Sequence, residues 1–158
     1  MEPLAQSPVF SDLMLKVSDV PVLGIIVGAV MTTIVQSSSA SIAVLQNLAA
    51  TAGPDGVTSI IGLAGAIPIL FGTNIGSTTT ALLASIGGTV NAKRTAISHT
   101  IFNVVGTLIF IWFTPYIADF VMMISPSGDE LNVISRQIAN AHMCFNIATT
   151  IVFLPLIN

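Results

Sequence analysis

The stretch Gln36-Ser37-Ser38-Ser39-Ala40-Ser41 places four hydroxyls and a carboxamide between two apolar arms. The arms, residues 21–35 and 42–50, contain no charged residue. A helix needs about 20 apolar residues to cross a bilayer, and both arms are shorter than that. Non-helical backbone survives at membrane depth only where protein or a water-filled cavity surrounds it. The pattern therefore predicts a re-entrant helical hairpin over residues 20–52, with its serines lining a polar space.

The composition of the chain supports a membrane location. Of the 158 residues, 53% are hydrophobic and 7% are charged, whereas a soluble domain carries about 25% charged residues. We therefore expect a multi-pass integral membrane protein in contact with lipid, rather than a soluble helical core that lacks its partner. No basic run is present that would hold nucleic acid. The single cysteine, Cys144, permits no internal disulfide.

The remaining segments predict an all-α protein. Residues 1–19 predict an amphipathic interfacial segment, and residues 95–118 and 136–156 predict two transmembrane helices with a solvent loop over 119–135. Residues 57–87 repeat the design of the hairpin, because apolar arms flank the glycine-punctuated stretch from Gly72 to Thr80. Glycines permit unwinding, so we expect a discontinuous helix there. In the first arm, Gly24 and Gly28 are four residues apart, which predicts close approach of two helix backbones.

Two later segments both read A-x-x-H-x-x-F-N, with His99 and Asn103 in one and His142 and Asn146 in the other. Residues four apart share a helix face, so each helix presents a polar stripe to the protein interior. We expect these histidines to form interhelical hydrogen bonds rather than to relay protons or bind a metal. An intramembrane protease with a Ser-His pair is the enzymatic alternative. The serine triplet lacks the G-x-S-x-G and S-x-x-K patterns, so we expect no enzyme and no catalytic residue.

Binding of small ions agrees better with the two polar centres. Transporters hold ions near the midplane with broken helices, whose N-termini attract anions and whose carbonyls and hydroxyls coordinate sodium. Neither centre contains a lysine or an arginine. An anion held only by hydrogen bonds and dipoles would be easier to desolvate if a cation bound beside it. This favours a sodium-coupled anion carrier over a simple channel, with packing of the hydroxyls between helices as the plain alternative.

Taken together, Gln36 to Ala40, the segment from Gly72 to Thr78 and the paired H-x-x-F-N helices resemble the type II sodium/phosphate cotransporters and their bacterial relatives. The resemblance implies sodium-driven symport of inorganic phosphate across the plasma membrane (the inner membrane of a bacterial cell), with no cofactor and no metal beyond sodium as the coupling ion. It implies substrate-binding roles for Ser37, Ser38, Ser39, Thr73, Asn74, Ser77 and Thr78. It implies sodium-binding roles for Gln36, Ser39, Asn74 and Thr79.

The chain departs from the family pattern in its length, because members carry two inverted repeats that each contain a Gln-Ser-Ser-Ser hairpin. This chain contains one such hairpin and resembles the second repeat with its trailing helices. We therefore expect one half of an inverted-repeat transporter, whose partner is a first inverted repeat or a second copy inserted in the opposite orientation. The alternatives are a carrier of another small anion on the same scaffold and a pore-forming or structural membrane subunit.

Overall fold

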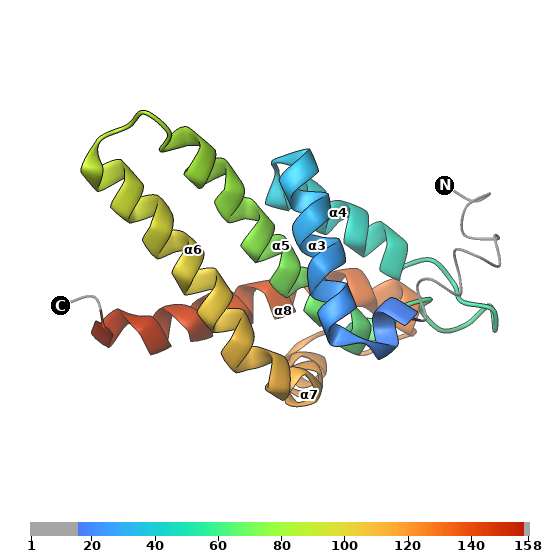
Figure 1. Ribbon diagram of the computed structural model, residues 1–158. Helices are drawn as coiled ribbons and strands as arrows, with labels where there is room; N and C mark the ends of the chain where they lie inside the picture. Colours follow the sequence, from blue (N-terminus) through green and yellow to red (C-terminus); the bar gives the residue numbers. More distant parts are fainter. Residues whose placement is uncertain (1–15, 157–158) are drawn as a thin grey trace.

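The computed structural model describes residues 16–156, and the part of the chain that it describes is almost entirely helical (Figure 1). The helices are α3 (Pro21–Val35), α4 (Ser38–Ala49), α5 (Gly62–Ala84), α6 (Val90–Phe110), α7 (Thr114–Ile124) and α8 (Glu130–Phe153). Short 3-10 turns follow α6 at Ile111–Phe113 and α8 at Leu154–Leu156. The all-α prediction is confirmed. The predicted interfacial segment lies outside the described residues except for residues 16–19, which are helical.

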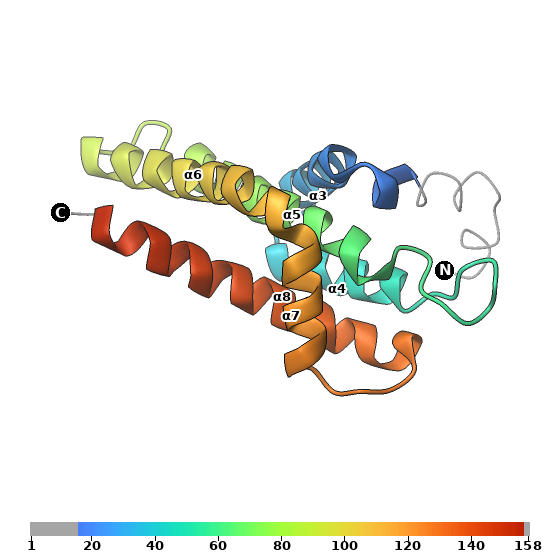
Figure 2. The same ribbon diagram turned by 90° about the horizontal axis from the view of Figure 1, so that it is seen from below.

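The helices form two layers (Figure 2). One layer contains α3, α5 and α6, the other contains α4 and α8, and α7 joins the two. The most extensive contact between helices joins α3 to α5, and both α4 and α8 also contact α5. The buried core follows this arrangement, because one hydrophobic cluster contains Ile67, Leu70 and Phe71 of α5 together with Leu45 of α4 and Ile138 of α8. Helix α5 is therefore the element around which the others are placed.

Glycines let α3 and α5 approach until their backbones touch. A Cβ atom on Gly28 would lie 2.0 Å from the carbonyl oxygen of Ile69, and one on Gly72 would lie 2.0 Å from that of Ile25. The contacts advance in the same direction along both helices, since Gly24 meets Pro68 and Thr33 hydrogen-bonds to Thr79. The two helices are therefore parallel. The predicted close approach at Gly24 and Gly28 is confirmed, with α5 as the partner.

The predicted discontinuous helix is wrong, because α5 continues without a break from Gly62 to Ala84. Gly72 and Gly76 do not unwind this helix. A Cβ atom on Gly76 would lie 2.5 Å from the carbonyl oxygen of Ala29, so this glycine, like Gly72, provides room for the α3 backbone. Pro68 is accommodated within the helix.

Two helical segments of the described residues are long and apolar enough to cross a membrane, Gly62–Ala84 and Val90–Ile124. The second begins before the predicted span over 95–118 and ends after it. Because α7 ends at Ile124 and α8 begins at Glu130, the predicted solvent loop over 119–135 is reduced to residues 125–129. Helix α8 covers most of the other predicted span, 136–156, but polar residues recur along it and it is not among the two apolar candidates.

Candidate functional site

The Gln-Ser-Ser-Ser stretch forms the turn between α3 and α4. Gln36 caps α3 with left-handed backbone angles, φ 53° and ψ 25°, and its N–H donates to the carbonyl of Thr32 at 2.7 Å. Ser37 is extended and caps the start of α4, where its hydroxyl oxygen accepts a hydrogen bond from the N–H of Ala40 at 3.3 Å. Two residues therefore end one helix and begin the next, and the serine triplet lies at the N-terminus of α4.

The start of α4 offers hydrogen-bond donors to an anion. The first N–H groups of any helix lack intrahelical partners, and the helix dipole makes this end positive. Ala40 donates to the Ser37 hydroxyl and Ser41 donates to the Ser37 carbonyl. The structure gives the N–H groups of Ser38 and Ser39 no partner among the residues it describes. Together with the serine hydroxyls, these groups could bind an oxyanion in the manner of other helix N-termini.

Three buried polar atoms on the surrounding helices have no hydrogen-bond partner in the described part of the chain. They are Thr32 Oγ1 on α3, Ser41 Oγ on α4 and Asn74 Nδ2 on α5; a fourth such atom, Thr107 Oγ1, lies on α6. Leaving a buried polar group unpaired costs about 1–3 kcal/mol. Thr32 and Ser41 are fully buried. Polar atoms in this state are suited to receive a ligand, and the two hydroxyl oxygens are of the kind that coordinates sodium.

Asn74 is linked to α8 by a hydrogen bond between its Oδ1 and Nε2 of His142, at 3.1 Å. The expectation of interhelical hydrogen bonding is therefore confirmed for His142. His99 is exposed and forms no such bond with another described helix, so for this histidine the expectation is wrong. Because His142 engages the carbonyl oxygen of the Asn74 carboxamide, the amino group is the end that remains free.

The other predicted site residues on α5 make hydrogen bonds of their own. The hydroxyls of Thr73, Ser77 and Thr78 donate to the carbonyls of Ile69, Asn74 and Ile75, one turn earlier in the helix, at 2.7–3.0 Å. The hydroxyl of Thr79 pairs with that of Thr33 on α3 at 3.3 Å. In the part of the chain that the structure describes, no hydrogen bond joins these residues to the serine turn. Within this group, Asn74 is the residue with a free buried donor, and the binding roles of the others stay predictions.

Local sequence patterns do not single out Thr32 or Ser41 as binding residues, and they do not predict that His142 pairs with Asn74. A signal for Thr32 was present, because it continues the four-residue spacing of Gly24 and Gly28 on the face of α3 that packs on α5. The partner of His142 lies far away in the sequence, and no local pattern identifies it.

Away from the serine turn, described residues line at least two cavities. One, of about 630 Å³, is lined by the start of α5, by α7 and by the start of α8. The other, of about 430 Å³, is lined by apolar and aromatic side chains of α7 and α8 and by Phe110. Neither is lined by the serine turn or by residues 72–79 of α5.

Comparison with known proteins finds one matching family model and several similar proteins. A model of the family described as Na+/Pi-cotransporter matches residues 3–126. The uncharacterized protein YqeW of Bacillus subtilis (strain 168) is 33% identical over 156 residues, which are 99% of this chain and 47% of that protein. The human sodium-dependent phosphate transport protein 2B is 40% identical over 92 residues, 56% of this chain and 12% of that protein.

A longer alignment joins the chain to the rat sodium-dependent phosphate transport protein 2C, with 30% identity over 138 residues, 85% of this chain and 21% of that protein. The chain thus spans about half the length of YqeW and a smaller part of the phosphate transport proteins. No solved structure matches it.

Proposed function

This chain belongs to the Na+/Pi-cotransporter family, and from that premise we propose that it supplies one half of the phosphate and sodium sites of a sodium-coupled symporter in the plasma membrane. The family is a transporter family and not an enzyme family. The whole transporter comprises more than this chain, in keeping with the 47% of YqeW that the chain covers. The missing half is a first inverted repeat or a second copy of the chain.

We assign phosphate binding to the turn between α3 and α4. The N–H groups of Ser38 and Ser39 and the three serine hydroxyls of residues 37–39 donate hydrogen bonds, and the dipole of α4 attracts negative charge. Asn74 Nδ2 is a further donor, held by His142 in the orientation that leaves it free. The hydroxyls of Thr73, Ser77 and Thr78 complete the predicted set from α5.

Sodium supplies the positive charge that the site lacks. The basic residues of the chain are Lys16, Lys93, Arg94 and Arg136, and none of them lies in α3, α4 or α5. A doubly charged anion in such a place needs a counter-charge. We assign sodium coordination to oxygen atoms of Gln36, Ser39, Asn74 and Thr79, and we add the unpaired hydroxyls of Thr32 and Ser41. Coupling follows because each ion lowers the cost of desolvating the other.

The proposed placement in the membrane is a re-entrant hairpin made by α3 and α4, packed on a spanning α5. Helix α3 has 15 residues and α4 has 12, so both are shorter than the roughly 20 residues that a span requires. Polar backbone at the turn between them needs protein or water around it. The contact of α3 and α4 with α5 provides part of that surrounding, and the other half of the transporter provides the rest.

The observation that carries the proposal is the set of unpaired buried polar atoms at Thr32, Ser41 and Asn74, on the three helices that meet near a cation-free helix N-terminus. Packing of hydroxyls between helices, the plain alternative, would leave them paired. A carrier of another small anion would use the same donors, and a pore would not need them.

Uptake of radiolabelled phosphate into proteoliposomes that contain the protein tests the proposal. We expect saturable uptake that requires an inward sodium gradient and is not supported by choline. The variant Ser38→Ala should raise the half-saturating phosphate concentration. Ser85→Ala is the matched control, since the Ser85 hydroxyl donates to the carbonyl of Leu82 at the end of α5. Sodium-independent, non-saturating flux would indicate a pore, and sodium-dependent uptake of sulfate but not phosphate would indicate a different anion.

A further inference from the structure

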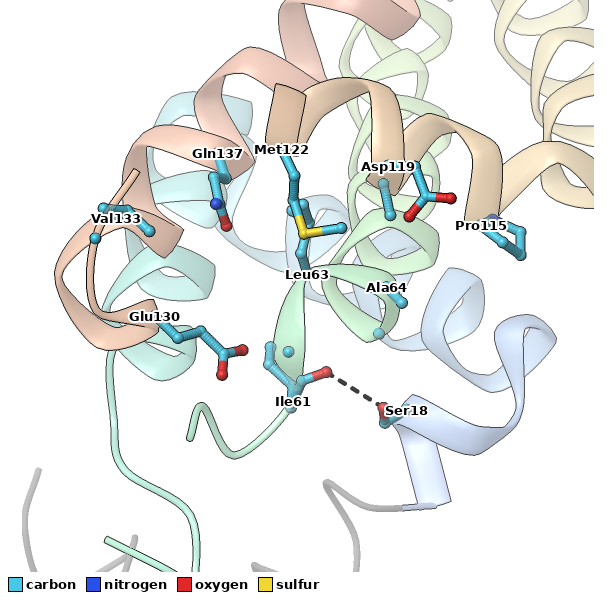
Figure 3. A pocket seen from close by; sticks show the side chains of 14 residues that line it. Ser18, Ile61, Leu63, Ala64, Pro115, Asp119, Met122, Glu130, Val133 and Gln137 are labelled. Atoms are coloured by element: carbon cyan, nitrogen blue, oxygen red, sulfur yellow. Dashed lines mark hydrogen bonds between the residues drawn. The ribbon is translucent and has the colours of Figure 1, made fainter. Parts of the chain in front are cut away.

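The 630 Å³ cavity lies between the start of α5, α7 and the start of α8, and we call it the α5–α7–α8 cavity (Figure 3). One candidate span, Gly62–Ala84, begins at this cavity, and the other, Val90–Ile124, ends there. It is therefore at an end of both spans, beside the short loop 125–129. It shares no residue with the proposed phosphate and sodium sites.

The α5–α7–α8 cavity is negatively charged. Asp119 of α7 and Glu130 of α8 line it, and no lysine or arginine does. Neither carboxylate forms an ion pair with any residue that the structure describes. The Glu130 carboxylate extends toward Gly62, where a Cβ atom would lie 3.8 Å from its Oε1. The lining therefore offers negative charge without a counter-ion of its own.

Gln137 of α8 provides an independent indication of a ligand. Only 8% of its surface is exposed, and its side chain forms no hydrogen bond within the described part of the chain. Figure 3 shows its amide pointing into the space between α8 and the start of α5. The amide is not among the fully enclosed unpaired groups of the described residues, so it is accessible from the cavity and free to bond a ligand there. Its oxygen can accept a hydrogen bond from a ligand that also reaches Glu130.

The size and the walls of the cavity indicate an organic ligand. A volume of 630 Å³ is far more than a single inorganic ion occupies, and it falls in the range of about 300–1,000 Å³ that small-molecule sites have. Leu63, Met122 and Val133 provide apolar walls. We propose that the α5–α7–α8 cavity binds a small organic cation, a primary ammonium group carried on an apolar body. The ammonium is held by Glu130 and Gln137, Asp119 adds negative charge elsewhere in the lining, and the apolar body packs on these walls.

Calorimetric titration of the purified protein with n-hexylammonium tests this proposal. We expect saturable binding, at least tenfold weaker binding of the neutral analogue 1-hexanol, and a loss of about tenfold or more in hexylammonium affinity for Glu130→Gln, as for the loss of a hydrogen bond to a charged group. Asp129→Asn is the matched control, because it removes the same charge from the adjacent, exposed residue outside the cavity. Gln137→Met, which keeps the length of the side chain, should also weaken binding.

The proposal is overturned if hexanol binds as well as hexylammonium, if Glu130→Gln and Asp129→Asn behave alike, or if sodium at equal ionic strength displaces the amine as readily as a second amine does. Melting curves of each variant verify folding.

Lipid nanodiscs distinguish the two sources of an ammonium group, a lipid headgroup and a free amine. If an ethanolamine lipid headgroup occupies the cavity, nanodiscs containing that lipid will lower hexylammonium affinity relative to pure phosphatidylcholine. If the natural ligand is a free amine, the two lipids will give the same affinity.

Discussion

Replacing Gly72 with alanine tests how α3 and α5 fit together. The added Cβ atom would lie 2.0 Å from the carbonyl oxygen of Ile25 and 2.8 Å from the amide nitrogen of Ala29. Both are backbone atoms, so no side-chain rotation relieves the clash. An ordinary contact between carbon and a carbonyl oxygen is about 3.3 Å, so the two helices must separate by about 1.3 Å. The separation would loosen the most extensive helix contact in the molecule.

The expected cost follows from two opposing terms. Overpacking a close contact costs typically about 1–3 kcal/mol, and a rigid backbone obstacle places this site at the upper end. Alanine is the better helix former, which returns about 0.5–1 kcal/mol. We expect a net loss of roughly 2 kcal/mol in the free energy of unfolding. For a chain of this size that corresponds to a melting temperature lower by about 4–8 °C.

Thermal unfolding in detergent, followed by circular dichroism, measures the effect. Gly28→Ala should behave like Gly72→Ala, because its Cβ atom would lie 2.0 Å from the carbonyl oxygen of Ile69. The control is Gly53→Ala, where the nearest atom would be at 3.5 Å and the backbone needs no left-handed angle. If all three variants melt together with the wild type, the close packing of α3 on α5 is incorrect.

Three further outcomes follow from the structure. Ser41→Ala should stabilise the sodium-free protein by about 1 kcal/mol, because it removes an unpaired buried hydroxyl. The same variant should weaken the activation of phosphate binding by sodium. A loss of stability in the absence of sodium would contradict the assignment of the Ser41 hydroxyl as an unpaired group. His142→Ala should lower the free energy of unfolding by about 1–3 kcal/mol, because it leaves the Asn74 carboxamide without its partner. The control His99→Ala, at an exposed residue, should change the free energy of unfolding by less than about 0.5 kcal/mol. Equal melting temperatures of the two variants would refute the pairing of His142 with Asn74. Hydrogen bonds from the Thr58 hydroxyl and from the N–H groups of Val57 and Thr58 lower the pKa of Asp55 below its ordinary 3.8. NMR titration should therefore show the turn at Asp55 intact above pH 3.8 and released as the pH falls through the lowered pKa. Release of the turn near neutral pH would disprove this prediction.

The sequence predicted an all-helical chain with apolar spans, and it located the turn at Gln36 and Ser37, because apolar run length and polar interruptions are local signals. It misjudged Gly72 and Gly76. A glycine that unwinds a helix and a glycine that admits a second backbone both lack a Cβ atom, and only the position of α3 separates the two cases. The equal four-residue spacing of glycines in both helices was the available signal for packing.

The long-range parts of the site were beyond local patterns. Pairing of His142 with Asn74 depends on how α8 crosses α5, which no periodicity specifies. The sequence pattern predicts that the last helix begins at residue 136 and that Glu130 lies in a solvent loop, so it gives no sign of the α5–α7–α8 cavity, which needs α8 to begin at Glu130. A run of polar residues such as Ser125 to Glu130 ends a helix in most sequences, and here it also begins the next one.

The most direct test of the central claim is equilibrium binding of radiolabelled phosphate to the purified protein, in sodium and in choline at constant ionic strength. A site without lysine or arginine should bind phosphate measurably tighter as sodium rises, and Ser38→Ala should weaken the sodium-dependent component while Ser85→Ala leaves it unchanged. Phosphate affinity that is the same in sodium and choline would contradict the account.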